Sequence, residues 1–205
     1  MNLKSLICYV VLGILLMGSG IVVSCDSFNE DLPECRLLVK FKYDYNMEFA
    51  DAFHAQVDKV ELYIFDKDGK FMFKQAEEGS ALSTGNYLME VELPVGQYQF
   101  MAWAGARDSY DITPLTPGVS TITDLKLKLK REASLIINKK METLWYGEII
   151  GVNFTGTEHQ TETINLIRDT KIVRFGFQSY TGTWTLDMND YDYEIIESNG
   201  HLGHD

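Results

Sequence analysis

The sequence predicts an all-β fold of two successive β-sandwich domains, and three observations lead to this prediction. Apolar and polar residues alternate in many short runs, the pattern of strands with one face on a core and the other in water. Glycine, proline and aspartate separate the runs at intervals of roughly 8–12 residues, as in sandwich folds. Apolar residues make up 45% of the chain and aromatic residues 12%, which is ample material for a core.

The first sandwich is expected over residues 36–131. Its strands are predicted from period-two alternation, in which every second residue is apolar. The runs are residues 37–43, 60–65, 87–93, 98–102 and 125–130. We expect these strands to pair in antiparallel sheets with one face toward solvent.

Two local features of this first domain are specific enough to predict individually. Asp66-Lys67-Asp68-Gly69 separates two aromatic-rich runs and predicts a hairpin with Gly69 at positive φ. Residues 46–56 are the exception to the strand pattern and predict a short helical turn. Phe49 and Phe53 lie four residues apart there, so we expect them on one face of that turn.

The second sandwich is expected over residues 132–205, with the boundary near residues 130–132. Its strands are predicted at 133–138, 144–150, 162–168, 171–178, 182–187 and 191–197. The chain stops soon after the strong run from Tyr191 to Ile196, without a helix cap or a polar tail. One interpretation is that this second sandwich is incomplete.

The first residues have the order of an export signal and are not expected to belong to the fold. Lys4 gives a positive start, and residues 6–17 are almost wholly apolar. The small residue Ser24 then stands directly before Cys25. We therefore predict that residues 1–24 are a signal peptide.

The end of this segment resembles the lipobox of bacterial lipoproteins. The resemblance implies cleavage between Ser24 and Cys25 and acylation of Cys25 with fatty acids such as palmitate, and two or three chains give lasting attachment. Residues 25–35 would then be a lipidated acidic tether. A retained membrane helix is the alternative, disfavoured because Gly18-Ser19-Gly20 interrupts the run of about 18 apolar residues needed. Without lipid, a Cys25–Cys35 disulfide becomes possible; with it, Cys35 is unpaired.

Charge and motifs exclude several classes of function. With 18 basic and 30 acidic side chains, the chain has a net charge of −12, which disfavours nucleic acid and anionic lipid surfaces. No His-Glu-x-x-His, Cys-x-x-Cys or Gly-x-Ser-x-Gly motif is present. We therefore expect no enzyme activity, no catalytic residue, no metal and no cofactor. The histidines are His54, His159, His201 and His204.

Two acidic stretches are candidate cation sites. If Gly69 is aligned with the invariant glycine of a calcium loop, Ile64 and Gln75 occupy positions that require carboxylates, so the hairpin interpretation is preferred. The second stretch lacks a loop glycine and is at most a weak cation site. Its members are Asp187, Asn189, Asp190, Asp192 and Glu194.

The tryptophans raise the alternative of a glycan-binding surface. Trp103 lies in Met-Ala-Trp-Ala-Gly-Ala, which is typical of a buried strand, so we predict a core position for it. Trp184, in Thr-Gly-Thr-Trp-Thr-Leu, is not assigned to the core. Exposed coplanar rings around Trp184 or Tyr191 would favour a glycan- or ligand-binding lipoprotein, and facing carboxylates in a cleft would favour a hydrolase.

Five stretches together resemble one family. They are Phe41–Met47, Val57–Phe71, Leu93–Tyr98, Ala102–Gly105 and Leu144–Gly147. With the lipobox ahead of them, they are similar to the FimB/Mfa-type fimbrial anchor lipoproteins of Bacteroidota. The resemblance covers nearly the whole chain, and residues 41–71 are its most specific part.

The resemblance implies a fold and a function. The fold would be two tandem β-sandwiches of transthyretin-like, Greek-key topology. The function would be that of a surface-exposed outer-membrane lipoprotein at the base of a type V fimbrium, which anchors the shaft and limits its length. The partner would be the fimbrial shaft subunit, and we expect β-strand addition to an unpaired edge of the second domain.

Overall fold

The computed structural model describes residues 35–131, 137, 139–180, 182, 187–196 and 201–203, and we restrict the account to them. The predicted signal peptide and all but the last residue of the tether lie outside these residues. So do Ser24, Cys25, Trp184 and His204.

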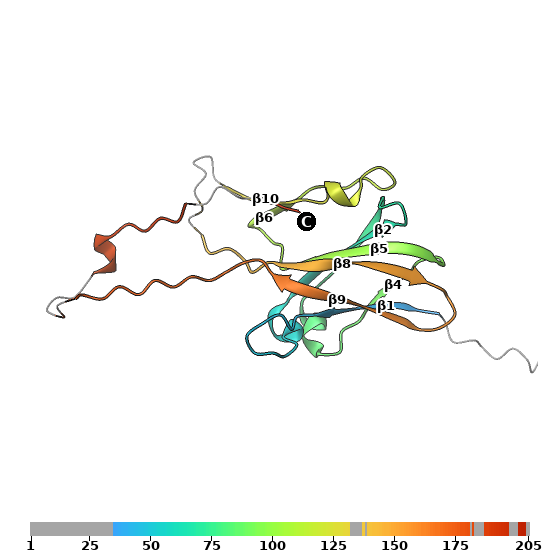
Figure 1. Cartoon of the computed structure of the whole chain (residues 1–205), viewed down its shortest axis with the longest axis horizontal. Helices are drawn as coiled ribbons and strands as arrows, with labels where there is room; N and C mark the ends of the chain where they lie inside the picture. Colours follow the sequence, from blue (N-terminus) through green and yellow to red (C-terminus); the bar gives the residue numbers. More distant parts are fainter. Residues whose placement is uncertain are drawn as a thin grey trace, which may run out of the picture. The chain divides into compact units, whose positions relative to one another are not determined.

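The described residues are nearly all β, as predicted (Figure 1). Seven strands form one sheet in the order β3-β2-β5-β8-β9-β1-β4. They are β1 (Leu37–Lys42), β2 (Lys59–Asp66), β3 (Phe71–Glu78), β4 (Met89–Val91), β5 (Gly96–Ala104), β8 (Trp145–Phe154) and β9 (Gln160–Arg168). A smaller sheet has the order β10-β7-β6, formed by β10 (His201–Leu202), β7 (Leu127–Leu129) and β6 (Tyr110–Ile112). The short helical elements are α2 (Phe53–Gln56), η1 (Ser80–Thr84), η2 (Ile122–Asp124) and η3 (Met188–Asp190).

The strand pairing is antiparallel throughout the described sheets, with one exception. β1 runs parallel to β9, in a register from Leu37 opposite Gln160 to Lys42 opposite Asn165. The large sheet is curled, so that strands from both of its halves contribute to one core. Its two edge strands also meet, because the Gln75 side-chain amide donates to the Glu90 carbonyl at 2.9 Å.

Two hydrophobic cores lie on opposite faces of β2 and β5. Val60, Leu62 and Ile64 of β2 belong to the core enclosed by the curled sheet. Tyr63 and Phe65 face the other way, into a core shared with β6, β7 and the segments beside them. Both faces of β2 are therefore buried, whereas the alternation predicted one face in water.

The predicted boundary near residues 130–132 does not separate two sheets. β8 lies after that boundary but pairs with β5 from Gly96 to Ala104, and β9 pairs with β1 along the whole of β1. A domain boundary is crossed by few contacts, whereas this one is crossed by two complete strand pairings. Residues 145–168 thus belong to the same sheet as residues 37–104.

Two strands predicted near the C-terminus do not form. Residues 171–178 and 191–196 have no assigned secondary structure, and their side chains are exposed. They have the alternation of a strand but no neighbouring strand, and a strand exists only through its pairing. The predicted strand 133–138 lies almost wholly outside the described residues, and so does most of 182–187.

The predicted hairpin is confirmed. Gly69 has φ +74°, and its N–H donates to the Asp66 carbonyl at 3.0 Å. The Asp66 carboxylate accepts hydrogen bonds from the N–H groups of Asp68 and Lys70, each at 2.9 Å. This carboxylate therefore stabilises the turn between β2 and β3.

The predicted helical turn forms, but only one of its two phenylalanines faces the core. Phe53 opens α2, is buried and stacks on Phe41 with ring centroids 5.8 Å apart. Phe49 lies before the helix at φ +54° and is 92% exposed. The four-residue spacing places two side chains on one face only inside a helix, and α2 begins after Phe49.

Candidate functional site

Among the described residues, most of the exposed large apolar side chains belong to segments that follow β1 and β9 at one end of the large sheet. Because β1 and β9 are parallel neighbours, the chain leaves both Lys42 and Arg168 at this same end. Cys35 stands at the opposite end, where its thiol donates to the carbonyl of Gly156, in the turn between β8 and β9, at 2.7 Å. Cys35 lies two residues before the start of β1, and it is an exposed free cysteine.

Beyond β9 the chain forms an extended segment that we call the arm, consisting of residues 169–180 and 187–196 (Figure 1). It carries more than half of the large apolar side chains that are exposed among the described residues. These are Ile172, Val173, Phe175, Phe177, Tyr180, Tyr191, Tyr193, Ile195 and Ile196. An exposed apolar concentration of this kind marks an interaction surface.

The two halves of the arm touch through aromatic rings. The Phe177 and Tyr193 rings lie 5.1 Å apart, and the Tyr191 and Tyr193 rings lie 6.4 Å apart. No strand is assigned to the described residues of the arm, so its backbone groups are not paired in a ladder. The arm therefore combines strand-like alternation and exposed apolar side chains with a backbone outside any assigned strand, features that suit strand addition.

The acidic cluster predicted as a weak cation site lies in this arm. The Asp187 carboxylate accepts from the N–H of Asn189 at 2.9 Å and from its side-chain amide at 2.8 Å. Asp187 thus caps η3 within its own turn. Among the residues that the structure describes, no group of three or more histidine, cysteine, aspartate or glutamate side chains is placed to hold a metal.

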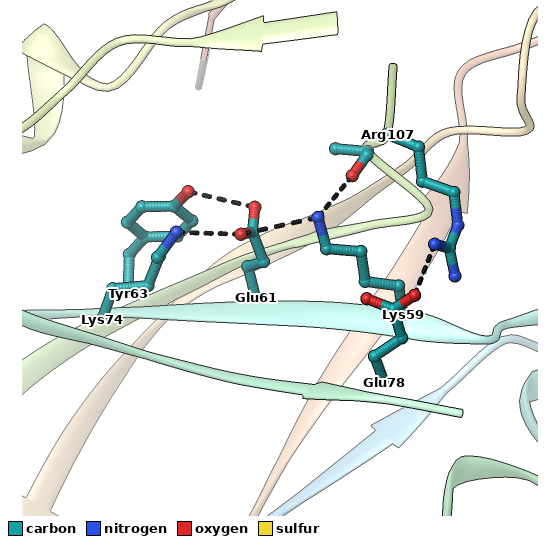
Figure 2. A network of polar contacts seen from close by, with 7 residues as sticks. Lys59, Glu61, Tyr63, Lys74, Glu78 and Arg107 are labelled. Atoms are coloured by element: carbon teal, nitrogen blue, oxygen red, sulfur yellow. Dashed lines mark hydrogen bonds and ion pairs between the residues drawn. The ribbon is translucent and has the colours of Figure 1, made fainter. Parts of the chain in front are cut away.

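A second polar arrangement lies on the face of β2 that also carries Tyr63 and Phe65 (Figure 2). Glu61 is only 7% exposed, and its carboxylate lies 2.9 Å from Lys74 Nζ and 3.8 Å from Lys59 Nζ. The Tyr63 hydroxyl donates to it at 3.3 Å, and Lys59 also donates to the Ala106 carbonyl at 2.8 Å. Burial, and secondly the Glu61 charge, raise the pKa of Tyr63 far above its ordinary value, so the phenol stays protonated.

This network ties strands together and does not create a reactive group. Glu61 is on β2, Lys74 is on β3 and Ala106 follows β5, so the charges join three segments. Arg107 extends it by pairing with Glu78 at the end of β3 and with Asp58 before β2. Each charged group of the network faces a partner of opposite sign, so the arrangement stabilises the sheet.

The tryptophans and histidines occupy the following places. Trp103 is 1% exposed and meets the Tyr146 ring edge to face at 5.5 Å, which confirms the predicted core position. Trp145 is also buried. His54 and His159 are exposed and far apart in sequence and fold, and the arm contains neither.

Sequence reasoning missed two features. The alternation places Glu61 on a solvent face, but the strand that contains it is covered on both sides. A buried glutamate requires a partner of opposite charge. Sequence reasoning also missed the exposure of Tyr45, Met47 and Phe49 ahead of α2. The only sequence signal for the second feature was an aromatic-rich stretch without a clear strand or helix period.

The described residues form an all-β protein whose arm exposes a concentration of apolar side chains. Among the described residues, no helix has the length and apolar character needed to cross a membrane. The sequence profile of the fimbrillin-A associated anchor proteins Mfa1 and Mfa2 matches residues 32–205. The chain belongs to this family.

Individual relatives and solved structures are also similar to this chain. The minor fimbrium anchoring subunit Mfa2 of Porphyromonas gingivalis is 26% identical over 191 residues, which cover 88% of this chain and 57% of that protein. A Bacteroides thetaiotaomicron crystal structure, provisionally described as a polysaccharide-binding protein, is 92% identical with a TM-score of 0.81 and covers 84% of this chain and 61% of its own. A Bacteroides ovatus structure provisionally described as an adhesin is 35% identical with a TM-score of 0.62, covering 71% of this chain and 49% of its own. The chain thus spans less than two thirds of these relatives.

Proposed function

We propose that this chain is an outer-membrane lipoprotein that anchors a fimbrial shaft at the cell surface and limits its length. The observation that carries the proposal is the family match over residues 32–205. The relative from P. gingivalis is described as an anchoring subunit, which gives the class of activity. The described residues add a sheet with an exposed apolar arm.

The arm is the proposed site of shaft capture, by β-strand addition. Val173, Phe175 and Phe177 alternate along its first half, so they share one side of the extended chain. A strand from the shaft subunit would bond to the arm backbone, and its side chains would cover these three. Backbone hydrogen bonds would then supply affinity, and the alternate side-chain contacts would fix the register.

The membrane attachment is proposed at Cys25, after cleavage behind Ser24. Residues 25–34 are joined covalently to Cys35, which stands at the end of the sheet opposite the arm. Attachment and capture would therefore act at opposite ends of one sheet. A subunit that is held by lipid and occupies the end of the shaft also prevents further subunits from adding there, which would limit its length.

The membrane attachment is tested in the native bacterium with Cys25→Ala. We expect this variant to release fimbriae into the medium, because the shaft base loses its lipid. Unchanged attachment of fimbriae to cells would contradict the proposal. Mass spectrometry of the unaltered protein provides the direct control, since acyl chains on Cys25 and loss of residues 1–24 are both expected.

The arm is tested with a triple variant, Val173→Ser, Phe175→Ser and Phe177→Ser. We expect the cells to keep the lipoprotein and lose the fimbriae, since the three side chains are exposed and the sheet does not depend on them. The matched control is Arg174→Ser with Gln178→Ser, which alters exposed polar residues of the same segment. Fimbriae retained by the triple variant would refute capture at the arm. A deletion from residue 132 is unsuitable, because it removes β8 and β9.

Glycan binding is the second candidate, because the 92% identical relative is provisionally described as polysaccharide-binding. The rings available in the arm do not favour it: Phe177 and Tyr193 are inclined by 39°, and Tyr191 and Tyr193 by 40°. A flat platform for sugar stacking needs coplanar rings. A glycan array with the purified chain tests this candidate, and specific binding lost in Tyr191→Ala would support it.

A further inference from the structure

A second group of exposed apolar side chains lies in residues 44–50, which we call the apolar loop. Tyr45, Met47 and Phe49 occupy alternate positions and are 62%, 95% and 92% exposed. Met47 and Phe49 are thus almost completely in water. Isolated exposed apolar residues are common, but three at alternate positions in one short loop are a concentrated patch.

The backbone of this loop is held in place by side-chain hydrogen bonds at its base. The Asn46 amide donates to the carbonyls of Tyr43 at 2.8 Å and Ala50 at 2.7 Å, which closes the loop. Its oxygen accepts from the Glu48 N–H at 2.9 Å. Asp51 fixes the exit by accepting from the Tyr43 N–H at 3.0 Å. The apolar tips therefore project from an ordered frame, so that binding would cost little conformational entropy.

Phe49 is also in an unfavourable backbone conformation. It is the one non-glycine residue with positive φ among the described residues, at +54°. The left-handed region is costly for any residue with a Cβ and is uncommon for bulky side chains. Glycine or asparagine would suit this position better, and either would remove an exposed ring. Neither stability nor solubility accounts for phenylalanine here, whereas contact with a partner does.

The position of the loop indicates which partner it contacts. It follows β1, and the arm follows β9, so the parallel pairing of these strands places both at the same end of the sheet. Acidic side chains flank the apolar tips at Glu48 and Asp51, whereas Asp44 is paired with Lys42. Anionic lipid headgroups would repel them, so a bilayer surface is disfavoured. A protein surface with an apolar pocket and a basic rim is complementary to the loop.

We propose that Met47 and Phe49 form a second docking point for the shaft subunit that the arm captures. This inference rests on the proposed function and extends it to a surface outside the arm. The two tips insert into an apolar pocket of that subunit while its strand pairs with the arm. Two contacts from neighbouring strands would fix the orientation of the captured subunit, which a single added strand does not do by itself.

The test uses the purified full-length chain and fimbriae sheared from the native bacterium as the immobilised probe. Phe49→Asn and Met47→Ser are each expected to weaken binding about tenfold or more, as for central contact residues of an interface. Phe49→Asn should leave the thermal unfolding temperature unchanged or raise it, because asparagine tolerates positive φ. If Phe49 had only a structural role, its substitution would not weaken binding to fimbriae while leaving the thermal unfolding temperature unchanged or higher. Val119→Ser is the control, since Val119 is 72% exposed and lies outside both surfaces.

The outcomes separate this inference from the proposed function. If Phe49→Asn binds fimbriae like the parent while the triple arm variant does not, the second docking point is refuted and arm capture stands. If the triple arm variant also binds fully, both are refuted. Sedimentation showing a dimer that Phe49→Asn dissociates would assign the loop to a second copy. Loop-dependent binding to phosphatidylethanolamine–phosphatidylglycerol vesicles would assign it to the membrane. Either of these last two results overturns the inference.

Discussion

Gly105→Ala is expected to destabilise the fold by two separate effects. Gly105 directly follows β5 at φ +72°, and its N–H donates to the Lys59 carbonyl at 2.9 Å, so the conformation is fixed by pairing with β2. A Cβ there would overlap the carbonyl oxygen of Thr143 and lie 2.8 Å from Cζ3 of the buried Trp145. The backbone carbonyl cannot move away as a flexible side chain could.

The magnitude follows from the two effects. Left-handed backbone costs about 1–2 kcal/mol for a residue with a Cβ. Forcing an extra methyl group into a packed site costs about 1–3 kcal/mol more. We expect a total loss of about 3 kcal/mol, a large part of the roughly 5–15 kcal/mol that holds a domain together.

Two other glycines separate these effects. Gly118 has φ +71° but open space where a Cβ would stand, so Gly118→Ala should show only the backbone cost of about 1–2 kcal/mol. Gly151 lies in β8 with neither constraint, so Gly151→Ala should be neutral or slightly stabilising, by about 0.5–1 kcal/mol.

The assay is urea unfolding followed by tryptophan fluorescence, because Trp103 and Trp145 are buried and report on the two cores. The difference between Gly105→Ala and Gly118→Ala measures the packing effect alone. If the two variants lose the same free energy of unfolding, the argument from Thr143 and Trp145 is wrong.

Two further predictions concern buried polar groups. Glu61→Gln should lower the free energy of unfolding by about 1–3 kcal/mol, since it breaks a buried charged contact. The control Glu78→Gln changes an exposed ion pair and should lower it by only about 0.2–1 kcal/mol. Equal losses in urea unfolding would contradict the burial argument. Burial, and next the charges of Glu142 and Asp169, raise the pKa of Tyr110 to about 12. In the unfolded chain a tyrosine has a pKa of about 10. The stability that the protonated Tyr110 hydroxyl contributes is therefore complete below pH 10, and it is lost as the pH rises toward 12. Unfolding followed by circular dichroism should show this loss above pH 10, and Tyr110→Phe should show a smaller one; the same decline in both would refute the assignment to Tyr110.

The sequence predicted strands well where a partner strand exists. The alternation at 37–43, 60–65 and 98–102 corresponds to β1, β2 and β5, and Gly69 marked the hairpin correctly. The same alternation failed at 171–178, because the period of a strand records which side chains share a face and not whether a neighbour is present.

Pairing between distant segments could not be predicted for the same reason. The alternation in residues 144–150 does not indicate that they pair with β5, so the strands after Arg131 were assigned to a separate second domain. Likewise, the second face of β2 is buried only because residues 106–129 fold over it, which places Glu61 in a charge network. For the candidate site, the lipobox and the family resemblance pointed to anchoring, but the apolar loop became evident only from the exposure of Met47 and Phe49.

The parallel pairing of β1 with β9 has a mechanical consequence for an anchor. Tension from the cell would enter at Cys35 and leave beyond Arg168, so it would pull the two neighbouring strands in opposite directions along their length. All six residues of β1 are in register with β9, and their hydrogen bonds would be loaded together in shear. Peeling would break such bonds one at a time and at lower force. If the chain anchors a fimbrium as proposed, this orientation of the sheet would resist the drag that the fimbrium transmits when a cell is pulled by flow.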